Sequence, residues 1–132
     1  MSLPKQLRGC SLKSGATEEQ LAAVEAELGR RLPEDYRQVL RDSDGLEGFV
    51  APETYLSLWS TSDLASLNEA YAVGEFLPGV VLLGTDGGDT GYGFTSRGRQ
   101  NRYIIVPLVG MSPETAREVA DSFSEFLGSL GL

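Results

Sequence analysis

The fold is decided by residues 17–36, which read TEEQLAAVEAELGRRLPEDY and predict a helix followed by a tight joint. Thr17 and Gln20 have the spacing of a capping box, in which each side chain satisfies a backbone N–H that the first turn leaves unpaired. Glycine is a common residue just past a helix end, so the helix is expected to finish before Gly29. The spacing i, i+3, i+7 places three apolar side chains on one stripe: Leu21, Val24 and Leu28.

A second short helix is predicted directly after this joint. Pro33 suits the first position of a helix, because the N–H that proline lacks has no partner there. Gly45 is expected to end the helix, and its apolar face consists of Tyr36, Val39 and Leu40. Two short helices with a tight connection form a helical hairpin.

Five short strands are predicted after the hairpin, at residues 46–50, 55–59, 80–83, 92–94 and 103–109. In the second of them, alternation puts Leu56 and Leu58 on one face and Tyr55 and Trp59 on the other. Four consecutive apolar residues in the third indicate a buried central strand. Pro107 places the last strand at a sheet edge or marks a bulge.

Two further helices complete the predicted elements. Ser62 is expected to cap the first, which Gly74 would end, and Ser112 is expected to cap the second, at residues 113–127. The stripe of this last helix consists of Ala116, Val119, Ala120, Phe123 and Leu127. The order of helices and strands predicts an α+β fold, in which residues 17–132 form a single domain with a mixed or antiparallel sheet flanked by helices.

The composition narrows the classes of function. The chain has 132 residues and no histidine, which excludes Ser-His-Asp and Cys-His catalysis and any zinc site that needs imidazole. A formal net charge of -8 argues against direct nucleic-acid binding, because that binding normally needs a basic patch. The single Cys10 excludes an internal disulfide and fits a reducing compartment. The residue pattern contains no catalytic constellation, so we expect a protein that is not an enzyme.

The apolar stretches are short, and none approaches the roughly 20 residues needed to span a bilayer. The first ten residues lack the apolar core of a signal peptide. We therefore expect a soluble, cytoplasmic protein without a membrane partner. Residues 1–16 show no apolar periodicity and are expected to form a mobile or loosely docked arm.

The glycine-rich segment 84–93 is the most distinctive stretch of the sequence. It lacks the Gly-Lys-Ser/Thr of a phosphate-binding loop, and its aspartates would repel a phosphate. Counted from Asp86, positions 3 and 12 of a calcium loop would be Gly88 and Arg97, which lack the required oxygen ligands. Both sites stay as weaker alternatives. The pattern favours a hairpin turn, without metal or cofactor, in which Asp86 and Asp89 bind neighbouring N–H groups or face a partner.

Charge is distributed unevenly along the chain. Residues 17–96 contain 15 acidic and 4 basic side chains, and residues 54–96 contain five acidic and no basic ones. The fields of such acids add and would steer a basic partner into contact, although an acidic face can also serve solubility alone. Tryptophan and tyrosine are enriched at binding hot spots, although a lone tryptophan more often packs in the core. We predict a partner-binding surface formed by Glu47, Glu53, Tyr55, Trp59, Asp63, Glu69, Asp86 and Asp89.

Several stretches together carry a resemblance to a known family. The first has the pattern Glu-x-x-Leu-Gly-x-x-Leu-Pro-x-x-Tyr at residues 25–36, followed by Leu40 and the helix end Asp44-Gly45. The later ones are Leu56-Ser57-Leu58, Asp63-Leu64 with Asn68, Leu83-Gly84-Thr85-Asp86-Gly87-Gly88-Asp89 and Tyr92-Gly93-Phe94. Over about residues 15–127, the chain resembles the SUKH superfamily, also called the Smi/Knr-type domain.

The resemblance implies an α+β fold and a function that depends on protein partners. Bacterial members of this family are typically immunity proteins that bind and neutralise a cognate toxin, often a nuclease, and fungal members regulate cell-wall synthesis. A basic nuclease toxin would suit the negative charge of this chain. The expected function is therefore toxin neutralisation by occlusion, with a general regulatory interaction module as the alternative. A hydrolase that uses a pair of carboxylates is the third hypothesis.

Overall fold

The structure is a computed structural model, and it describes residues 4–97 and 99–132. Helices and strands occur in small groups along the described chain. Their bounds are η1 (Lys5–Leu7), β1 (Ser11–Leu12), α1 (Glu18–Leu28), α2 (Glu34–Asp42), β2 (Leu46–Ala51), β3 (Thr54–Leu58), α3 (Thr61–Ala70), α4 (Val73–Phe76), β4 (Val80–Thr85), β5 (Thr90–Arg97), β6 (Gln100–Pro107), β7 (Arg117–Ala120) and α5 (Phe123–Ser129).

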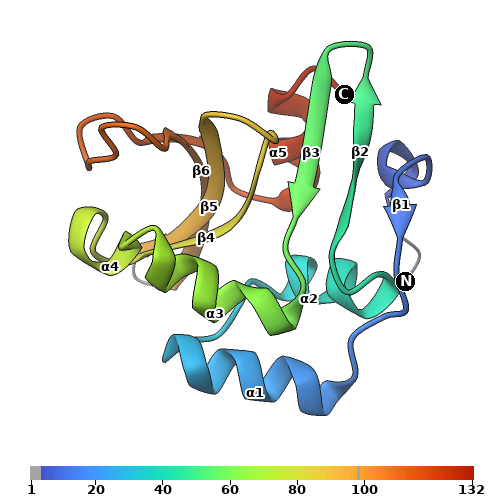
Figure 1. Cartoon of the computed structure of the whole chain (residues 1–132), viewed down its shortest axis with the longest axis horizontal. Helices are drawn as coiled ribbons and strands as arrows, with labels where there is room; N and C mark the ends of the chain where they lie inside the picture. The colour runs from blue at the N-terminus through green and yellow to red at the C-terminus, as the bar shows by residue number, and fades with distance from the viewer. Residues whose placement is uncertain (1–3, 98) are drawn as a thin grey trace.

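The strands form one sheet with the spatial order β1-β2-β3-β4-β5-β6-β7, so every strand pairs with its neighbours in the chain. All six pairings are antiparallel. The sheet twists strongly between β3 and β4, so that β4 to β6 lie at an angle to the β2–β3 hairpin (Figure 1). The predicted α+β fold in a single domain is confirmed, and the sheet is antiparallel.

Helix α1 has both ends predicted from the sequence. The Thr17 hydroxyl accepts a hydrogen bond from the Gln20 N–H at 3.1 Å, and the Gln20 side chain accepts one from the Thr17 N–H at 2.8 Å. Gly29 follows the last turn with a φ of 72°, a left-handed conformation that costs glycine little. The capping box and the glycine cap are both confirmed.

Replacing Thr17 with alanine is expected to lower the free energy of unfolding by about 1 kcal/mol. The substitution removes the hydroxyl that accepts from the Gln20 N–H at the exposed end of α1. Urea denaturation measures the loss, and Thr17→Ser serves as the control because it keeps the hydroxyl. An equal loss in both variants would contradict the capping role.

Helix α3 begins earlier and ends earlier than predicted. Ser60 is the N-cap residue, while Ser62 lies inside the helix. The capping comes from the loop between α2 and β2, where the Asp44 carboxylate accepts from the Thr61 N–H at 2.7 Å and from the Thr61 hydroxyl at 2.9 Å. The helix ends at Ala70, and Gly74 lies within the separate short helix α4. Such a long-range cap cannot be recognised from local spacing.

The predicted helix at 113–127 is wrong. Residues Arg117–Ala120 form strand β7, which pairs with β6, and a separate helix α5 begins at Phe123. Ser112 instead begins a turn, since its carbonyl accepts from the N–H groups of Thr115 and Ala116 at 3.1 Å each.

The start of α5 has two acceptors of its own. The Ser122 hydroxyl accepts from the Glu125 N–H at 3.1 Å, and the Asp35 carboxylate of α2 accepts from the Phe123 N–H at 2.7 Å. The same carboxylate accepts from the Tyr103 hydroxyl at 2.7 Å. The apolar stripe predicted one helix over residues 113–127. The pairing of β7 with β6 and the capping of α5 by Ser122 and Asp35 instead divide this segment into a strand and a helix.

Strand β6 is an interior strand, so the prediction of an edge position for Pro107 is wrong. The strand lies between β5 and β7, and it ends at Pro107 rather than at Val109. Pairing with β7 involves only Tyr103, Ile104 and Ile105, which leaves the missing N–H of Pro107 without consequence for that ladder.

The described part of the N-terminal segment is docked, contrary to the expectation of a loose arm. Leu7 and Cys10 are buried in the main core, and Ala16 N–H donates to the Leu40 carbonyl at 2.8 Å. Strand β1 adds to the sheet through the pairs Ser11 with Glu47 and Leu12 with Leu46. Residues 1–3 lie outside the described part of the chain.

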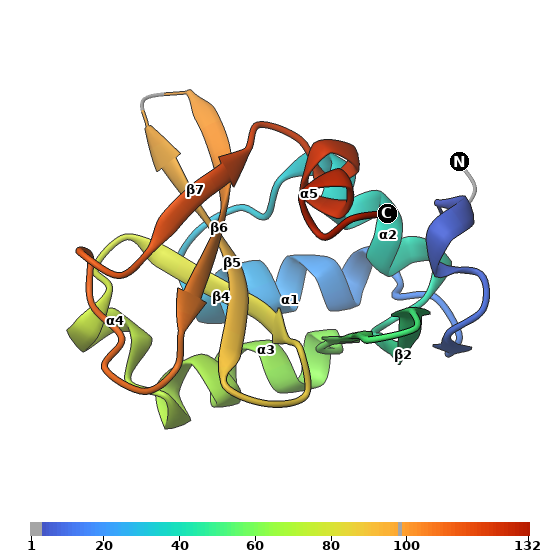
Figure 2. The same cartoon turned by 90° about the horizontal axis from the view of Figure 1, so that it is seen from above.

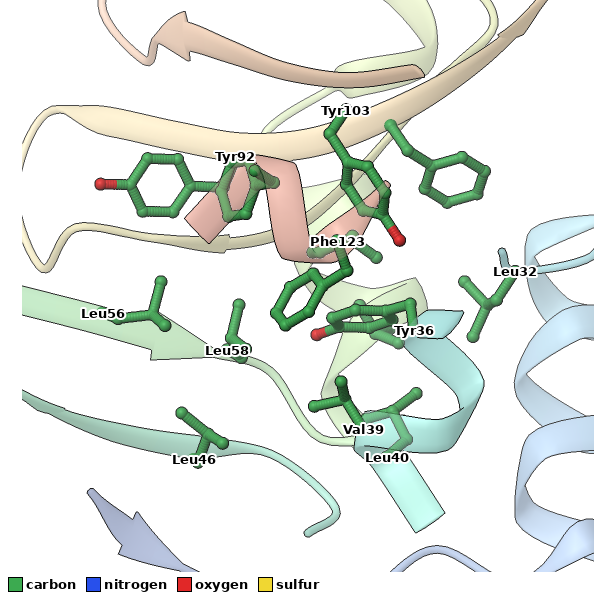
Figure 3. Packing of buried hydrophobic residues seen from close by; sticks show 14 of the residues in the cluster. Leu32, Tyr36, Val39, Leu40, Leu46, Leu56, Leu58, Tyr92, Tyr103 and Phe123 are labelled. Atoms are coloured by element: carbon green, nitrogen blue, oxygen red, sulfur yellow. The ribbon is translucent and has the colours of Figure 1, made fainter. Parts of the chain in front are cut away.

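The main core lies between the sheet, α1, α2 and α5. The ring of Phe123 contacts the rings of Tyr36 and Tyr103 edge-on, with centroids 5.5 and 5.8 Å apart. Leu46, Leu56 and Leu58 from the β2–β3 hairpin belong to the same cluster, and Leu58 lies beside Phe123 (Figure 3). The burial of Leu56 and Leu58 confirms the alternation predicted for their strand.

A second cluster lies on the other face of β4 and β6. It consists of Val73, Leu77, Leu82, Ile104, Val106 and Met111. Strand β4 is therefore covered on both faces, as its run of apolar residues predicts.

Candidate functional site

The outer face of the β2–β3 hairpin is the part of the sheet that presents the predicted site. Cross-strand pairing places Glu47 opposite Ser57 and Phe49 opposite Tyr55, so these four side chains share one face. The opposite face carries leucines of the main core. Helices α2 and α5 lie together on the core side of β2 (Figure 2).

Two aromatic rings form the centre of this face. Phe49 is 67% exposed, and its ring meets the ring of Tyr55 edge-on with 5.0 Å between centroids. The Tyr55 hydroxyl donates to Oε2 of Glu47 at 2.8 Å. This hydrogen bond is the main cause that raises the pKa of Tyr55, because it favours the protonated phenol. Tyr55 thereby fixes the position of the Glu47 carboxylate.

The β4–β5 turn closes one side of the aromatic pair. Oδ1 of Asp86 accepts from the N–H groups of Gly88 at 2.8 Å and Thr90 at 3.1 Å. Gly87 has a φ of 84°, and a Cβ at this position would come within 2.8 Å of the Tyr55 ring. The glycine-rich segment is a hairpin turn in which Asp86 binds neighbouring N–H groups, as predicted.

Two adjoining hollows mark the face. The first, here called the Phe49 hollow, has a volume of about 540 Å³ and is lined by Glu47, Phe49, Tyr55, Ser57, Asp86 and Gly87. The second, the Trp59 hollow, has a volume of about 160 Å³ and is lined by Lys13, Leu46, Glu47, Ser57, Leu58, Trp59, Ser60 and Asp63. They share Glu47 and Ser57, and together they are called the β2–β3 surface below.

The Trp59 hollow differs from its neighbour in two respects. Its tryptophan is half-buried and stacks on Tyr71 at 5.9 Å between centroids, which combines a packing role with an accessible position. It also contains Lys13, a cation contributed by the N-terminal segment. The charge counts over residues 17–96 and 54–96 began after Lys13 and so did not include this positive charge.

Five of the eight predicted partner-binding residues meet at the β2–β3 surface. They are Glu47, Tyr55, Trp59, Asp63 and Asp86. Glu53 lies at the turn between β2 and β3, and Glu69 lines a different hollow beside α1 and α4. Asp89 is exposed, and its carbonyl accepts from the Leu108 N–H at 2.7 Å, next to the end of β6.

Phe49 is the central residue that the sequence reasoning missed. Its signal was present, because Phe49 alternates with Leu46 and shares the outer face with Glu47 in a predicted strand. A large aromatic side chain on the solvent side of a strand favours an interaction surface. Ser57 lies on the face that alternation along the strand assigns to Tyr55 and Trp59, whereas Gly87 enters the site through turn geometry.

The acidic residues of the molecule fall into two environments. On the helical side, Arg37 pairs with Glu25 at 3.2 Å and with Glu34 at 3.3 Å, and Arg41 pairs with Glu18 at 2.8 Å. Among the side chains that the structure describes, no ion pair involves a carboxylate of the β2–β3 surface. The negative field of that surface is therefore less neutralised than the field of the α1–α2 side.

A metal site and a membrane span each place a requirement on the described residues. Within them, no group of three or more Cys, Asp or Glu side chains is placed to hold a metal ion. No helix in the described part of the chain is long and apolar enough to cross a membrane.

Comparison with known proteins identifies the family of this chain. No curated protein matches the chain. The model of the SMI1 / KNR4 family (SUKH-1) matches residues 15–129, a region that extends from the segment before α1 to the end of α5. It includes the helical hairpin, the β2–β3 surface and the glycine-rich turn. The chain therefore belongs to the SMI1/KNR4 family (SUKH-1).

Proposed function

We propose that this protein is a non-enzymatic immunity protein, which neutralises a cognate toxin by covering the toxin's functional surface. Membership in the SMI1/KNR4 family supports an immunity-like or regulatory domain. The observation that carries the proposal is the β2–β3 surface, where two aromatic rings are surrounded by carboxylates that lack ion-pair partners among the described residues. We expect the protein to act in the cytoplasm.

The composition of this surface suits a basic protein partner. Aromatic side chains provide a large contact area, and surrounding charges set the encounter rate and the register of the complex. A nuclease toxin needs positive charge to bind nucleic acid, so it would carry a surface complementary to Glu47, Asp63 and Asp86. Occupation of that positive surface would keep nucleic acid out, and inhibition would need no chemistry from this chain.

Co-expression with the product of the adjacent reading frame tests the proposed function. The expected result is that this chain forms a stable complex with the product and restores growth of cells in which the product is toxic. A product that is bound but harmless would favour the regulatory alternative. A toxic product that this chain neither binds nor restrains would contradict the proposal.

Reversing Glu47 and Asp63 to lysine is expected to slow association with that partner by about tenfold at low salt. Both side chains are exposed at the β2–β3 surface, so the change acts on the encounter more than on the fold. Stopped-flow measurements at several ionic strengths give the association rate, and the difference should shrink as salt screens the charges.

The matched control reverses Glu53 and Glu69, which change the net charge equally but lie outside the two hollows. This control should slow association much less. Equal slowing by both double variants would mean that net charge alone matters, and it would contradict the assignment of the surface.

A further inference from the structure

The Phe49 hollow has the lining of a guanidinium site, and we propose that it receives an arginine side chain from the protein partner. The inference rests on the proposed function, because it names the chemistry that the partner offers to the same surface. It adds an occupant for one hollow and an orientation for the complex, neither of which follows from family membership.

The aromatic part of the hollow provides a flat surface for a planar cation. Phe49 lies on the outer face of β2, and its ring is held at an interplanar angle of 77° to the ring of Tyr55. Gly87 lies against the Tyr55 ring from the side of the β4–β5 turn. Tyr55 is thus held between two neighbours, while Phe49 is 67% exposed. A guanidinium can stack on such an exposed ring, and arginine makes this contact more often than lysine.

The carboxylates on either side are already held in position. Oε2 of Glu47 accepts from the Tyr55 hydroxyl, and Oδ1 of Asp86 accepts from two backbone N–H groups. Within the described chain, the second oxygen of each carboxylate accepts no hydrogen bond, so it can accept from an incoming cation. Because one oxygen of each carboxylate already accepts hydrogen bonds, the side chain loses little rotamer freedom when the other oxygen binds a cation.

The two hollows differ in charge, and this difference decides where the cation enters. Lys13 lines the Trp59 hollow and would repel a second cation there. Among the described residues, no lysine or arginine lines the Phe49 hollow. The arginine of the partner therefore enters beside Phe49, between Glu47 and Asp86.

A titration with a small probe tests the hollow without the partner. The tripeptide acetyl-Gly-Arg-Gly-amide is added to the isotope-labelled full chain, and backbone amide shifts are followed by NMR. Saturable shifts are expected at Phe49, Tyr55 and Gly87, and they should weaken as salt is added. The matched peptide with citrulline has the same shape without the charge, and it should cause no saturable shift.

Two substitutions connect the shifts to the proposed contacts. Phe49→Ala and Glu47→Gln should each weaken binding of the arginine peptide by about 2- to 5-fold. Phe76→Ala and Glu69→Gln are the matched controls, because they change an exposed aromatic and an exposed acid outside the Phe49 hollow, and neither should alter the affinity. Unchanged amide spectra elsewhere in each variant establish that the fold is intact.

The outcomes separate this inference from the proposed function. Absence of saturable shifts at the hollow, equal binding of the citrulline peptide, or equal weakening by the controls would overturn the arginine site, whatever the growth assay reports. A growth assay without protection would contradict the immunity role and leave the peptide titration as an independent result. Acetyl-Gly-Lys-Gly-amide is titrated in the same way, and equal binding of this lysine peptide would overturn the choice of arginine.

Discussion

Replacing Leu82 with alanine is expected to lower the free energy of unfolding by about 2–5 kcal/mol. Leu82 has 0% of its surface exposed and lies in β4, where its side chain packs in the second cluster with Leu77, Ile104 and Val106. Truncation removes apolar contacts and leaves a cavity that the neighbouring strands can only partly close. The cost is large because Leu82 is covered by both the sheet and the α4 segment.

Urea denaturation followed by tryptophan fluorescence measures this loss. Val109→Ala is the control, because Val109 is 80% exposed and a surface truncation of this kind changes stability by less than about 0.5 kcal/mol. The midpoint should fall for Leu82→Ala with little change in the slope of the transition. A loss below about 1 kcal/mol would show that the site collapses without a cavity, and β4 would not be the central strand described here.

The elements with complete local signals were predicted well. Helix α1 has its own N-cap pair and its own glycine at the end, so every group that defines it lies within a few residues. The alternation of Leu56 and Leu58 likewise needs only the neighbouring side chains. The turn after β4 was predicted for the same reason, since Asp86 binds N–H groups two and four residues ahead.

The errors concern elements whose limits depend on distant residues. The segment 113–127 has apolar residues at helical spacing, but Arg117–Ala120 pair with β6 and the N–H of Phe123 binds Asp35, which is 88 residues away. The local signal that could have divided it was Ser122 with Glu125, the spacing of a helix N-cap. The start of α3 depends on Asp44 in the same way, because the cap comes from the loop between α2 and β2.

The candidate site was predicted in part for a related reason. Charge counted along the chain found Glu47, Asp63 and Asp86, which the strand pairing brings to one surface. The same count included Glu69 and Asp89, which the topology places elsewhere. Counting charges along the sequence gives the sign of the net charge of a region. Only the register of β2, β3 and β4 decides which of these charged side chains share a face.

Asn68 shows how one side chain can complete the sheet. Strand β3 pairs with β4 only at Ser57–Leu58 opposite Gly84–Thr85, so its ladder does not reach Leu82. Asn68 on α3 provides the hydrogen bonds that a neighbouring strand would otherwise provide. The Oδ1 of Asn68 accepts from the Leu82 N–H at 2.8 Å, and the Nδ2 of Asn68 donates to the Leu82 carbonyl at 2.9 Å. Nδ2 also donates to the Leu64 carbonyl at 2.8 Å. The amide thus satisfies both backbone groups of a buried residue.

Replacing Asn68 with alanine is therefore expected to lower the free energy of unfolding by about 2–4 kcal/mol, since it leaves two backbone groups of Leu82 without their partners. Asn68→Asp should be destabilising as well, because a carboxylate can accept from the Leu82 N–H but cannot donate to the Leu82 carbonyl. Glu69→Ala, an exposed neighbour on the same helix, is the control and should cost less than about 0.5 kcal/mol. Hydrogen exchange adds a local readout: the Leu82 amide should lose protection in Asn68→Ala before the β5–β6 amides do. If Asn68→Ala were as stable as the control, the amide would not be what holds α3 to β4.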